Sequence, residues 1–304
     1  MDGDHQPVAS ALRPDVPAEL LARVRAAAPQ VGVNASAWPA LSLLRADHPA
    51  ANLPSVYEPS LCVVVQGSKR AVLGPDSFQY DAGHFLVVSL TLPVMAHILD
   101  ASVERPYLCI RLALDPVAIS ELLLRRPSTQ ASATRASGRG LYMAPMSTEL
   151  ADALLRLMRA LDTPDDLPIL APMQVREVCY RVLTGPLGSR LQDLVDSGGQ
   201  ARRIARAIEL IRHQVDQPLR VAQLAEALHM SESSLHHRFK QLTTLTPVQY
   251  QKRLRLHEAR RLMQSEGLPA ASAGSRVGYQ SPSQFSRDYR RLFGAPPRRS
   301  LAAG

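Results

Sequence analysis

Hydrogen-bonding side chains recur with one spacing in two short stretches of the C-terminal third of the chain. Both stretches follow the pattern i, i+3, i+4 and i+7, which places four side chains on one face of an α-helix. Hydroxyl, imidazole, ammonium and guanidinium groups can all bond to base edges or to phosphates. The pattern therefore predicts two exposed helical faces suited to duplex DNA. These faces carry Ser233, His236, His237 and Lys240 in the first stretch, and Ser283, Ser286, Arg287 and Arg290 in the second.

Arg287 is the strongest single candidate for base recognition, because its planar fork can pair with O6 and N7 of guanine. A phosphate contact is the alternative for this residue. His236 and His237 can also bond to base edges, whereas Arg290 and Arg291 lie further along and are expected to contact the backbone. The complete set expected to contact DNA is Ser233, His236, His237, Lys240, Ser283, Gln284, Ser286, Arg287, Arg290 and Arg291.

An apolar stripe on the opposite side of each stretch predicts the helices that position these groups. Ser231 and Ser281 are suitable N-caps, and the pattern that starts at Ser231 is repeated fifty positions later from Ser281. The repeated positions are Leu235, Phe239, Leu242 and Pro247, matched by Phe285, Tyr289, Leu292 and Pro297. A further short helix and a tight turn precede each copy. The sequence therefore predicts helix-turn-helix motifs at about 222–243 and 270–293, with two plain helical hairpins as the alternative.

Three motifs in this region resemble the AraC/XylS family of bacterial transcription regulators. They are Leu224-Ala225-Glu226-Ala227-Leu228, Val277-Gly278-Tyr279-Gln280-Ser281 and Phe293-Gly294-Ala295-Pro296-Pro297. The resemblance covers about the last hundred residues. It implies two recognition helices that enter successive major-groove segments and are held by a long connecting helix. The chain departs from the family at His229, which replaces a turn glycine, and at Pro269, Ser272 and Gly274, which weaken a helix.

The connecting helix is expected to begin at Thr246-Pro247 and to run to about Gln264. A helix of this length spans roughly 27 Å, comparable with the ~34 Å between successive major-groove faces. Leu256, Ala259 and Met263 are expected on its buried side. Its cations are interpreted as phosphate contacts, or alternatively as groups that only aid solubility. These cations are Lys252, Arg253, Arg255, Arg260 and Arg261.

The N-terminal half predicts short strands that are separated by Gly, Pro and Asp, an arrangement typical of an antiparallel barrel or sandwich. The motifs Tyr57-Glu58-Pro59, Tyr80-Asp81-Ala82-Gly83-His84 and Glu104-Arg105-Pro106 are similar to the N-terminal sensor domain of one branch of the same family. This resemblance implies a cupin-like β-barrel with flanking helices. The expected fold is therefore α+β: the barrel, then an all-α domain with two helix-turn-helix motifs joined by a long helix.

Charge and composition divide the chain. Residues 199–304 carry 18 Lys and Arg against 7 Asp and Glu, whereas the first 198 residues carry 17 basic and 20 acidic residues. The resulting net charges of +11 and −3 indicate a polyanionic partner for one half only. We expect an N-terminal segment at 1–36, a sensor and dimerisation domain at 37–196, a hinge at Asp196-Ser197-Gly198-Gly199 and a DNA-binding domain at 200–304.

The sequence contains no clear pattern of metal-binding or cofactor-binding residues. His48, His84 and His97 do not form a metal-ligand pattern, so neither a metal nor another cofactor is expected. Cys62 and Cys109 are interpreted as buried apolar residues, with a redox or electrophile sensor as the alternative. The three scattered cysteines and the lack of a secretory or membrane-spanning segment predict a cytoplasmic protein.

The favoured hypothesis is a transcriptional regulator rather than an enzyme. It would bind double-stranded promoter DNA and respond to an unknown small-molecule effector in the barrel, and it would contact RNA polymerase if it is an activator. The helix at 173–185 resembles the dimerisation helix of such regulators, or alternatively closes the barrel. The competing hypotheses are a cupin-like metalloenzyme with a basic helical tail and a nucleoid-type protein without sequence preference.

Overall fold

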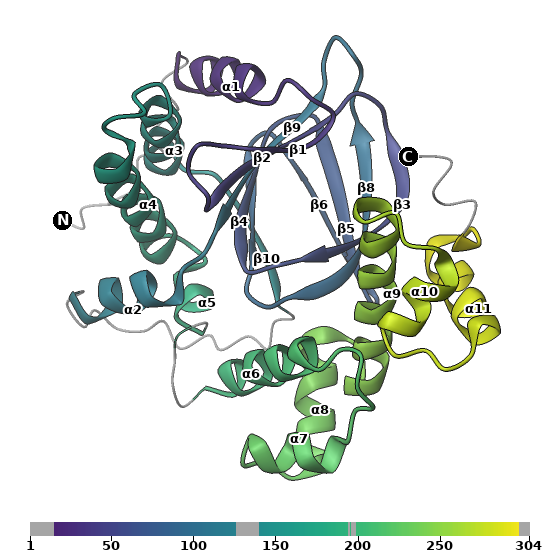
Figure 1. Cartoon of the computed structure of the whole chain (residues 1–304). Coiled ribbons are helices and arrows are strands. Elements are labelled where there is room, and N and C mark those ends of the chain that lie inside the picture. The colour runs from purple at the N-terminus through teal and green to yellow at the C-terminus, as the bar shows by residue number, and fades with distance from the viewer. Residues whose placement is uncertain (1–14, 126–139, 194, 196–198, 298–304) are drawn as a thin grey trace.

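The computed structural model describes residues 15–125, 140–193, 195 and 199–297. An antiparallel β-sheet domain with flanking helices is followed by a domain of helices only (Figure 1). Of the expected hinge at 196–199, only Gly199 lies within the described residues, where it is the N-cap of a helix. No helix in the described ranges is long and apolar enough to span a bilayer.

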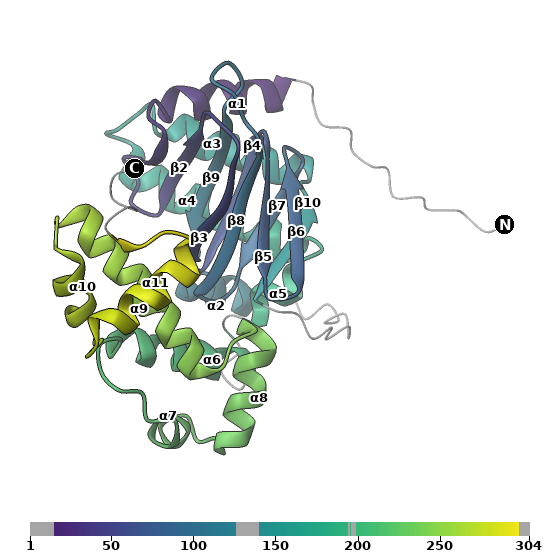
Figure 2. The ribbon, with the colours of Figure 1, turned by 90° about the vertical axis from the view of Figure 1, so that its right-hand side faces the viewer.

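The strands form two separate sheets rather than the closed barrel that we expected. The first sheet has six strands in the order β1-β2-β9-β4-β7-β10, and the second has four in the order β3-β8-β5-β6. All of the pairings are antiparallel. The strands are β1 (Gly32–Ala35), β2 (Leu41–Ala46), β3 (Ala50–Tyr57), β4 (Ser60–Gln66), β5 (Ser68–Leu73), β6 (Asp76–Asp81), β7 (His84–Val88), β8 (Leu92–Asp100), β9 (Tyr107–Ala113) and β10 (Leu141–Pro145). The two sheets lie face to face in Figure 2.

Strand β4 shows why the central strands are almost wholly apolar. Successive side chains of a strand point to opposite faces of the sheet. Leu61 and Val63 belong to the hydrophobic cluster shared with the outer helices, whereas Cys62 and Val64 belong to the cluster between the sheets. Both faces of β4 are covered, so both sets of positions are apolar.

Five helices flank the sheets: α1 (Asp15–Ala27), α2 (Pro116–Arg125), α3 (Thr148–Ala160), α4 (Leu167–Thr184) and α5 (Gly188–Asp193). α1, α3 and α4 cover the outer face of the six-stranded sheet (Figure 1). α4 begins six residues before the helix expected from Met173, because Pro168 fits its first turn and Leu167 and Ala171 are buried. Pro172 is accommodated inside this helix.

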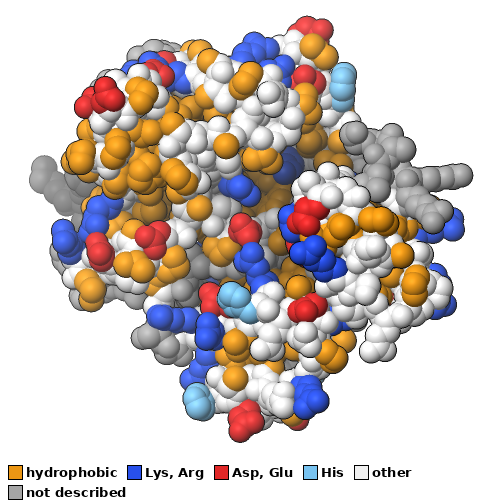
Figure 3. All heavy atoms as spheres, in the orientation of Figure 1, with side chains coloured by type: hydrophobic (Ala, Val, Ile, Leu, Met, Phe, Trp, Pro, Cys, Tyr) orange, Lys and Arg blue, Asp and Glu red, His pale blue; other side chains and the backbone are white. Residues whose placement is uncertain are grey.

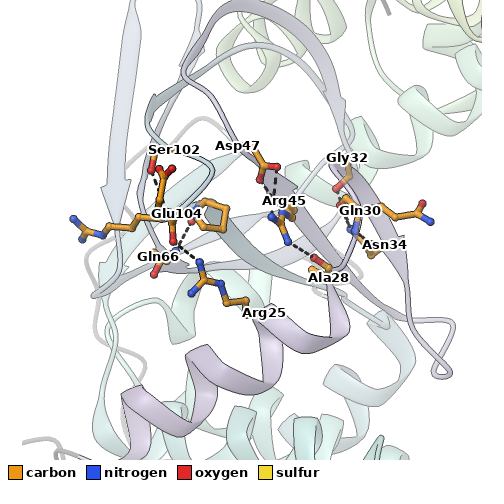
Figure 4. A network of polar contacts seen from close by, with 12 residues as sticks. Arg25, Ala28, Gln30, Gly32, Asn34, Arg45, Asp47, Gln66, Ser102 and Glu104 are labelled. Atoms are coloured by element: carbon orange, nitrogen blue, oxygen red, sulfur yellow. Dashed lines mark hydrogen bonds and ion pairs between the residues drawn. The ribbon is translucent and has the colours of Figure 1, made fainter.

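The end of the N-terminal segment expected at 1–36 is tied to the six-stranded sheet through β1. β1 pairs with β2 from Gly32 to Ala35. Arg45 on β2 donates to the Asp47 carboxylate at 2.7 Å and to the Ala28 carbonyl at 3.4 Å (Figure 4). Arg25 of α1 also contacts the Glu104 carbonyl. These bonds hold α1 and β1 against the sheet.

The second domain consists of α6 (Gln200–His213), α7 (Val221–Ala227), α8 (Glu232–Thr243), α9 (Pro247–Ser265), α10 (Ala270–Arg276) and α11 (Pro282–Phe293). α6 buries an apolar stripe at Ile204, Ile208 and Ile211. The connecting helix is α9, and its expected cap at Thr246 forms a capping box with Gln249. Its 19 residues span about 28 Å.

The helical domain packs directly on the β-sheet domain through its first half. The hydrophobic cluster between the sheets continues into α6, α7, α8 and the first half of α9, whereas the second half of α9 forms a separate cluster with α10 and α11. The buried Tyr250 hydroxyl donates to the Thr91 carbonyl at 2.7 Å, and Gly140 N–H donates to the Leu242 carbonyl at 3.3 Å. The α7–α8 and α10–α11 pairs are thus attached to different cores.

Candidate functional site

The structure places the ten predicted DNA contacts on α8 and α11, largely in solvent. Nine of the ten residues are exposed and His236 is half-buried. Leu235 and Phe239 of α8, and Phe285 and Tyr289 of α11, are buried on the opposite sides. Arg287 forms no ion pair with any other described residue, so its guanidinium is available to a ligand. The predicted polar faces are therefore exposed to solvent. Whether they contact DNA stays a prediction.

Both helices begin with the same arrangement of hydroxyl groups. The Ser231 hydroxyl accepts from Ser234 N–H at 3.2 Å, and the Ser281 hydroxyl accepts from Gln284 N–H at 3.3 Å. Two predicted contact residues join these caps: the Ser233 hydroxyl lies 3.2 Å from that of Ser231, and the Ser283 hydroxyl lies 2.9 Å from that of Ser281. The fifty-residue repeat seen in the sequence is thus also a structural repeat.

The turns before α8 and α11 use different residues for the same backbone conformation. His229 has φ 53° and Gly278 has φ 85°, both in the left-handed region. His229 thus adopts the conformation that the turn glycine it replaces would allow, although non-glycine residues seldom adopt this region. At Gly278 a side chain is excluded for a second reason, because a Cβ atom would lie 2.0 Å from the Asp216 carbonyl oxygen.

Arg255 holds the two helix pairs together, a role that the sequence analysis missed. Its guanidinium donates to the carbonyl groups of Val215 at 2.6 Å, Gln217 at 2.8 Å and Gly278 at 3.2 Å. One side chain of α9 thus joins the α6–α7 loop to the α10–α11 turn. Arg255 was expected to contact phosphate, and these bonds give it a structural role within the chain. The nearest partner is 23 positions away, so local spacing gives no signal of this contact.

Other cations of α9 are also engaged within the chain. Lys252 forms an ion pair with Asp288 of α11 at 2.8 Å, and Arg261 pairs with Glu258 at 2.8 Å. The Arg260 guanidinium lies 4.9 Å from the ring centroid of Phe293. Arg260 and Arg261 also line a cleft against β3. Whether Lys252, Arg260 and Arg261 also contact phosphates stays a prediction.

A cavity of about 200 Å³ lies between the two sheets. It has room for about seven water molecules at roughly 30 Å³ each, which is enough for a small ligand. Its walls combine two thiols, two cations, one carboxylate, two phenols and two serine hydroxyls with apolar residues. The polar residues that line it include Tyr57, Ser60, Cys62, Lys69, Tyr80, Cys109 and Arg111.

A second hollow, of about 800 Å³, separates β3 from α6 and α9. Figure 3 shows a depression at the centre of this face, with Lys, Arg, Asp and Glu side chains around it. Arg212 of α6 crosses between the domains to Glu58 at 2.8 Å and to the Thr91 hydroxyl at 3.2 Å. Ser55, Val56 and Glu58 line both this hollow and the cavity between the sheets, so β3 and the residue that follows it form a shared wall.

The histidines considered for metal binding make other contacts. The His84 ring bonds with the Asp81 carboxylate at 2.7 Å, and the His97 ring accepts from Asn52 N–H at 3.3 Å. In the described ranges, no group of three or more His, Cys, Asp and Glu side chains is placed to hold a metal ion.

Two family descriptions match the chain in the regions just described. Residues 37–190 match the family described as "AraC-type transcriptional regulator N-terminus", and residues 224–302 match "Helix-turn-helix domain". Among curated proteins, the chain is 31% identical over 113 residues to the HTH-type transcriptional regulator CdhR of Pseudomonas aeruginosa, covering 37% of this chain and 34% of CdhR. It is 28% identical over 96 residues to the arabinose operon regulatory protein of Escherichia coli, covering 31% of this chain and 33% of that protein. The match thus spans about a third of each relative.

Solved structures of ToxT from Vibrio cholerae share the fold over most of the chain. A variant of apo ToxT with one substitution has a TM-score of 0.58 at 10% identity, covering 86% of this chain and 97% of ToxT. Wild-type ToxT with a bound unsaturated fatty acid has a TM-score of 0.54 at 13% identity, covering 86% and 93%. An N-terminal family match over half of the chain and a helix-turn-helix match after it agree with the two domains of the structure. The chain therefore belongs to the AraC/XylS family of transcriptional regulators.

Proposed function

We propose that the chain is a sequence-specific regulator that binds promoter DNA through two helix-turn-helix motifs. In this proposal α7 and α8 form one motif, α10 and α11 form the other, and α8 and α11 are the recognition helices. The observation that carries the proposal is the matched pair of exposed polar faces on α8 and α11, each backed by large buried apolar side chains. The basic charge of this half of the chain would add sequence-independent attraction to phosphates.

We assign the base contacts first to Arg287 and His237 and to the hydroxyls of Ser233 and Ser283, because these groups are exposed at the start or in the middle of the two helices. Arg290 and Arg291 lie in the last turn of α11, where backbone contacts are more common. The half-buried His236 is the weakest of the ten candidates, because part of its ring is already covered by protein.

The β-sheet domain would be the sensor, and the cavity between its sheets would hold a small-molecule effector. A ligand there would touch Ser55, Val56 and Glu58, which also line the hollow facing α6 and α9. A displacement of β3 would therefore alter the contact between Glu58 and Arg212. The effector would change DNA affinity only by as much as it binds one arrangement of the two domains more tightly than the other.

A second copy of the chain is the proposed partner at the surface of α4. Ile169, Met173 and Tyr180 of this helix are exposed, and Val117 of the neighbouring α2 is exposed as well. Figure 3 shows hydrophobic side chains gathered over the α3 and α4 side of the molecule. An apolar surface of this kind favours association. RNA polymerase would be a further partner if the protein is an activator.

Selection of fragments from a genomic library with purified full-length protein tests the DNA-binding proposal. An enriched fragment should retain its complex when bulk DNA is present in excess, because specific affinities exceed non-specific ones by about 10³-fold or more. A complex that bulk DNA removes completely would support the nucleoid-type alternative. Turnover of a small substrate by the same preparation, together with bound metal, would favour the enzyme.

A further inference from the structure

The cavity between the sheets contains two neighbouring thiols beside two cations. Cys62 is on β4, Lys69 is on β5, and Cys109 and Arg111 are both on β9. Both cysteines are buried and free. Thiols are good nucleophiles when deprotonated, and cations next to them favour that form.

Strand register explains why the two thiols meet. Cys62 lies opposite Arg111, and Val64 lies opposite Cys109, so the two cysteines are diagonal neighbours on one face. The Ser60 hydroxyl lies within hydrogen-bonding distance of the Cys62 sulfur, at 3.7 Å, and the Cys109 thiol donates to the Ile110 carbonyl at 3.4 Å. Diagonal positions have Cα atoms about 7–8 Å apart, beyond the 4.4–6.8 Å usual for disulfides. The geometry therefore suits one thiolate with a neighbouring proton donor better than a disulfide.

Lys69 makes the cavity attractive to an anion. Its side chain is buried, and its nitrogen lies 5.1 Å from the Tyr57 ring centroid and 5.8 Å from that of Tyr107. Burial lowers the pKa of Lys69, but the Tyr57 phenol and the two thiols outweigh burial, so that its net pKa is raised. None of the described carboxylates forms an ion pair with this ammonium group. A buried cation without an anion is costly, so a ligand that supplies one would be stabilised.

Cys62 is the activated member of the pair. The neighbouring Cys109 side chain lowers the pKa of Cys62 to about 7 against the effect of burial, and Ser60, Lys69 and Arg111 contribute in the same direction. The pKa of Cys109 is raised well above its usual value by the neighbouring Cys62 side chain and by burial. Cys179 serves as an internal comparison, since burial raises its pKa to about 11.

We propose that Cys62 is a nucleophile that captures a small anionic electrophile in the cavity between the sheets, with Lys69 and Arg111 holding its carboxylate. The compound class that fits is an α,β-unsaturated carbonyl compound that also carries a carboxylate. The regulatory consequence rests on the proposed function: the adduct would fill the cavity beside β3 and change the fit of the two domains.

The addition balances without any oxidant or reductant. The Cys62 sulfur forms a bond to the β-carbon, and the π electrons of the C=C bond move to the α-carbon. That carbon takes a proton from the Cys109 thiol, which then regains one from solvent. One S–C bond and one C–H bond replace the C=C π bond. Elimination would reverse the same steps and release the ligand.

Iodoacetate and iodoacetamide test this proposal in the full-length protein, because they differ in charge but hardly in size. Each reagent forms an S–CH₂ bond and releases iodide, and peptide mass spectrometry gives the rate at each cysteine. We expect Cys62 to react about tenfold or more faster than Cys179 at pH 7, with half-maximal rate near pH 7. Iodoacetate should react with Cys62 at least as fast as iodoacetamide does, because the cavity attracts anions.

Lys69→Met should lower the rate at which iodoacetate modifies Cys62 by about fivefold or more. It should change the rate of modification by iodoacetamide by less than about twofold. The proposal is overturned if Cys62 reacts no faster than Cys179, or if iodoacetamide is the faster reagent at wild-type Cys62. The wild-type comparison requires no variant, so a folding defect of Lys69→Met cannot obscure it. The assay contains no DNA, so the two proposals fail separately. If the protein does not bind DNA but Cys62 is reactive, only the proposed function is refuted. If Cys62 is unreactive, only this inference is refuted.

Discussion

Arg287 shows how one side chain could carry sequence recognition. It is exposed on α11, away from the buried Phe285 and Tyr289, and Ser281 fixes the start of its helix. We expect Arg287→Ala to cost about 1–3 kcal/mol on the preferred site and to relax selection at one base pair. The matched control is Arg291→Ala, which should weaken binding to all sequences alike. Both effects can be measured by fluorescence anisotropy with a panel of single-base variants. Equal weakening across the panel for Arg287→Ala would identify it as a phosphate contact.

His257 gives a second residue-scale prediction, for stability against pH. The pKa of His257 is lowered to about 4 by burial of the ring and by Arg260 and Arg253. The unfolded chain has a pKa near 6.5 and binds the proton more readily, so stability falls as pH drops from about 6.5 to 4. We expect a loss of about 1–3 kcal/mol over this interval that is absent in His257→Asn. Urea unfolding at pH 7 and 4.5 provides the comparison, and an identical pH dependence in both proteins would contradict it.

At the scale of elements, α10 has a sequence of low helix propensity, but the helix is closely packed in the structure. Helix formation is opposed by Pro269, Ser272 and Gly274. Pro269 is the N-cap, and Gly274 lets α10 approach the buried Phe285, because a Cβ there would lie 2.9 Å from the Phe285 Cγ atom. The poor helix propensity is therefore accompanied by close contact with the proposed recognition helix.

Gly274→Ala should consequently destabilise the protein, although alanine is the better helix former. The intrinsic gain of about 1 kcal/mol would be outweighed by overpacking that costs about 1–3 kcal/mol. Ser272→Ala is the control, because Ser272 is exposed on the same helix and should be neutral or slightly stabilising. Thermal unfolding of the two variants measures the difference. A more stable Gly274→Ala would show that the α10–α11 contact can relax.

Elements with a strong period could be predicted from the sequence, and those defined by long-range pairing could not. The helices that became α8, α9 and α11 were predicted because their buried stripes follow the helical period. β1, β2, β3 and β10 were missed as strands, and β1 and β3 have mixed or exposed burial patterns. Two separate sheets instead of a barrel, and the three carbonyl contacts of Arg255, depend on partners far away in the chain.

At the scale of the whole molecule, the contacts between the first half of the helical domain and the β-sheet domain include a buried hydrogen bond and an exposed ion pair. Tyr250 is completely buried and donates to the Thr91 carbonyl at 2.7 Å. The side chains of Arg212 and Glu58 are 45% and 51% exposed, so solvent screens their attraction. The buried bond should therefore contribute more to the contact between the domains.

Tyr250→Phe should lower the free energy of unfolding by about 1–2 kcal/mol, because it leaves the Thr91 carbonyl without its donor. Arg212→Ala should cost less than about 1 kcal/mol. Chemical denaturation of both variants gives the two values under one condition. A larger loss for Arg212→Ala would mean that the ion pair, rather than the buried hydroxyl, holds the domains together.

The most direct test of the central claim is a footprint of the full-length protein on an enriched genomic fragment. The claim is that α8 and α11, connected by the 19-residue α9, enter two segments of the same duplex. We predict two protected major-groove segments about 10–10.5 base pairs apart, centre to centre. Arg287→Ala should weaken protection of the one contacted by α11 and leave the other protected. Protection of a single segment, or of none after competition with bulk DNA, would contradict the account.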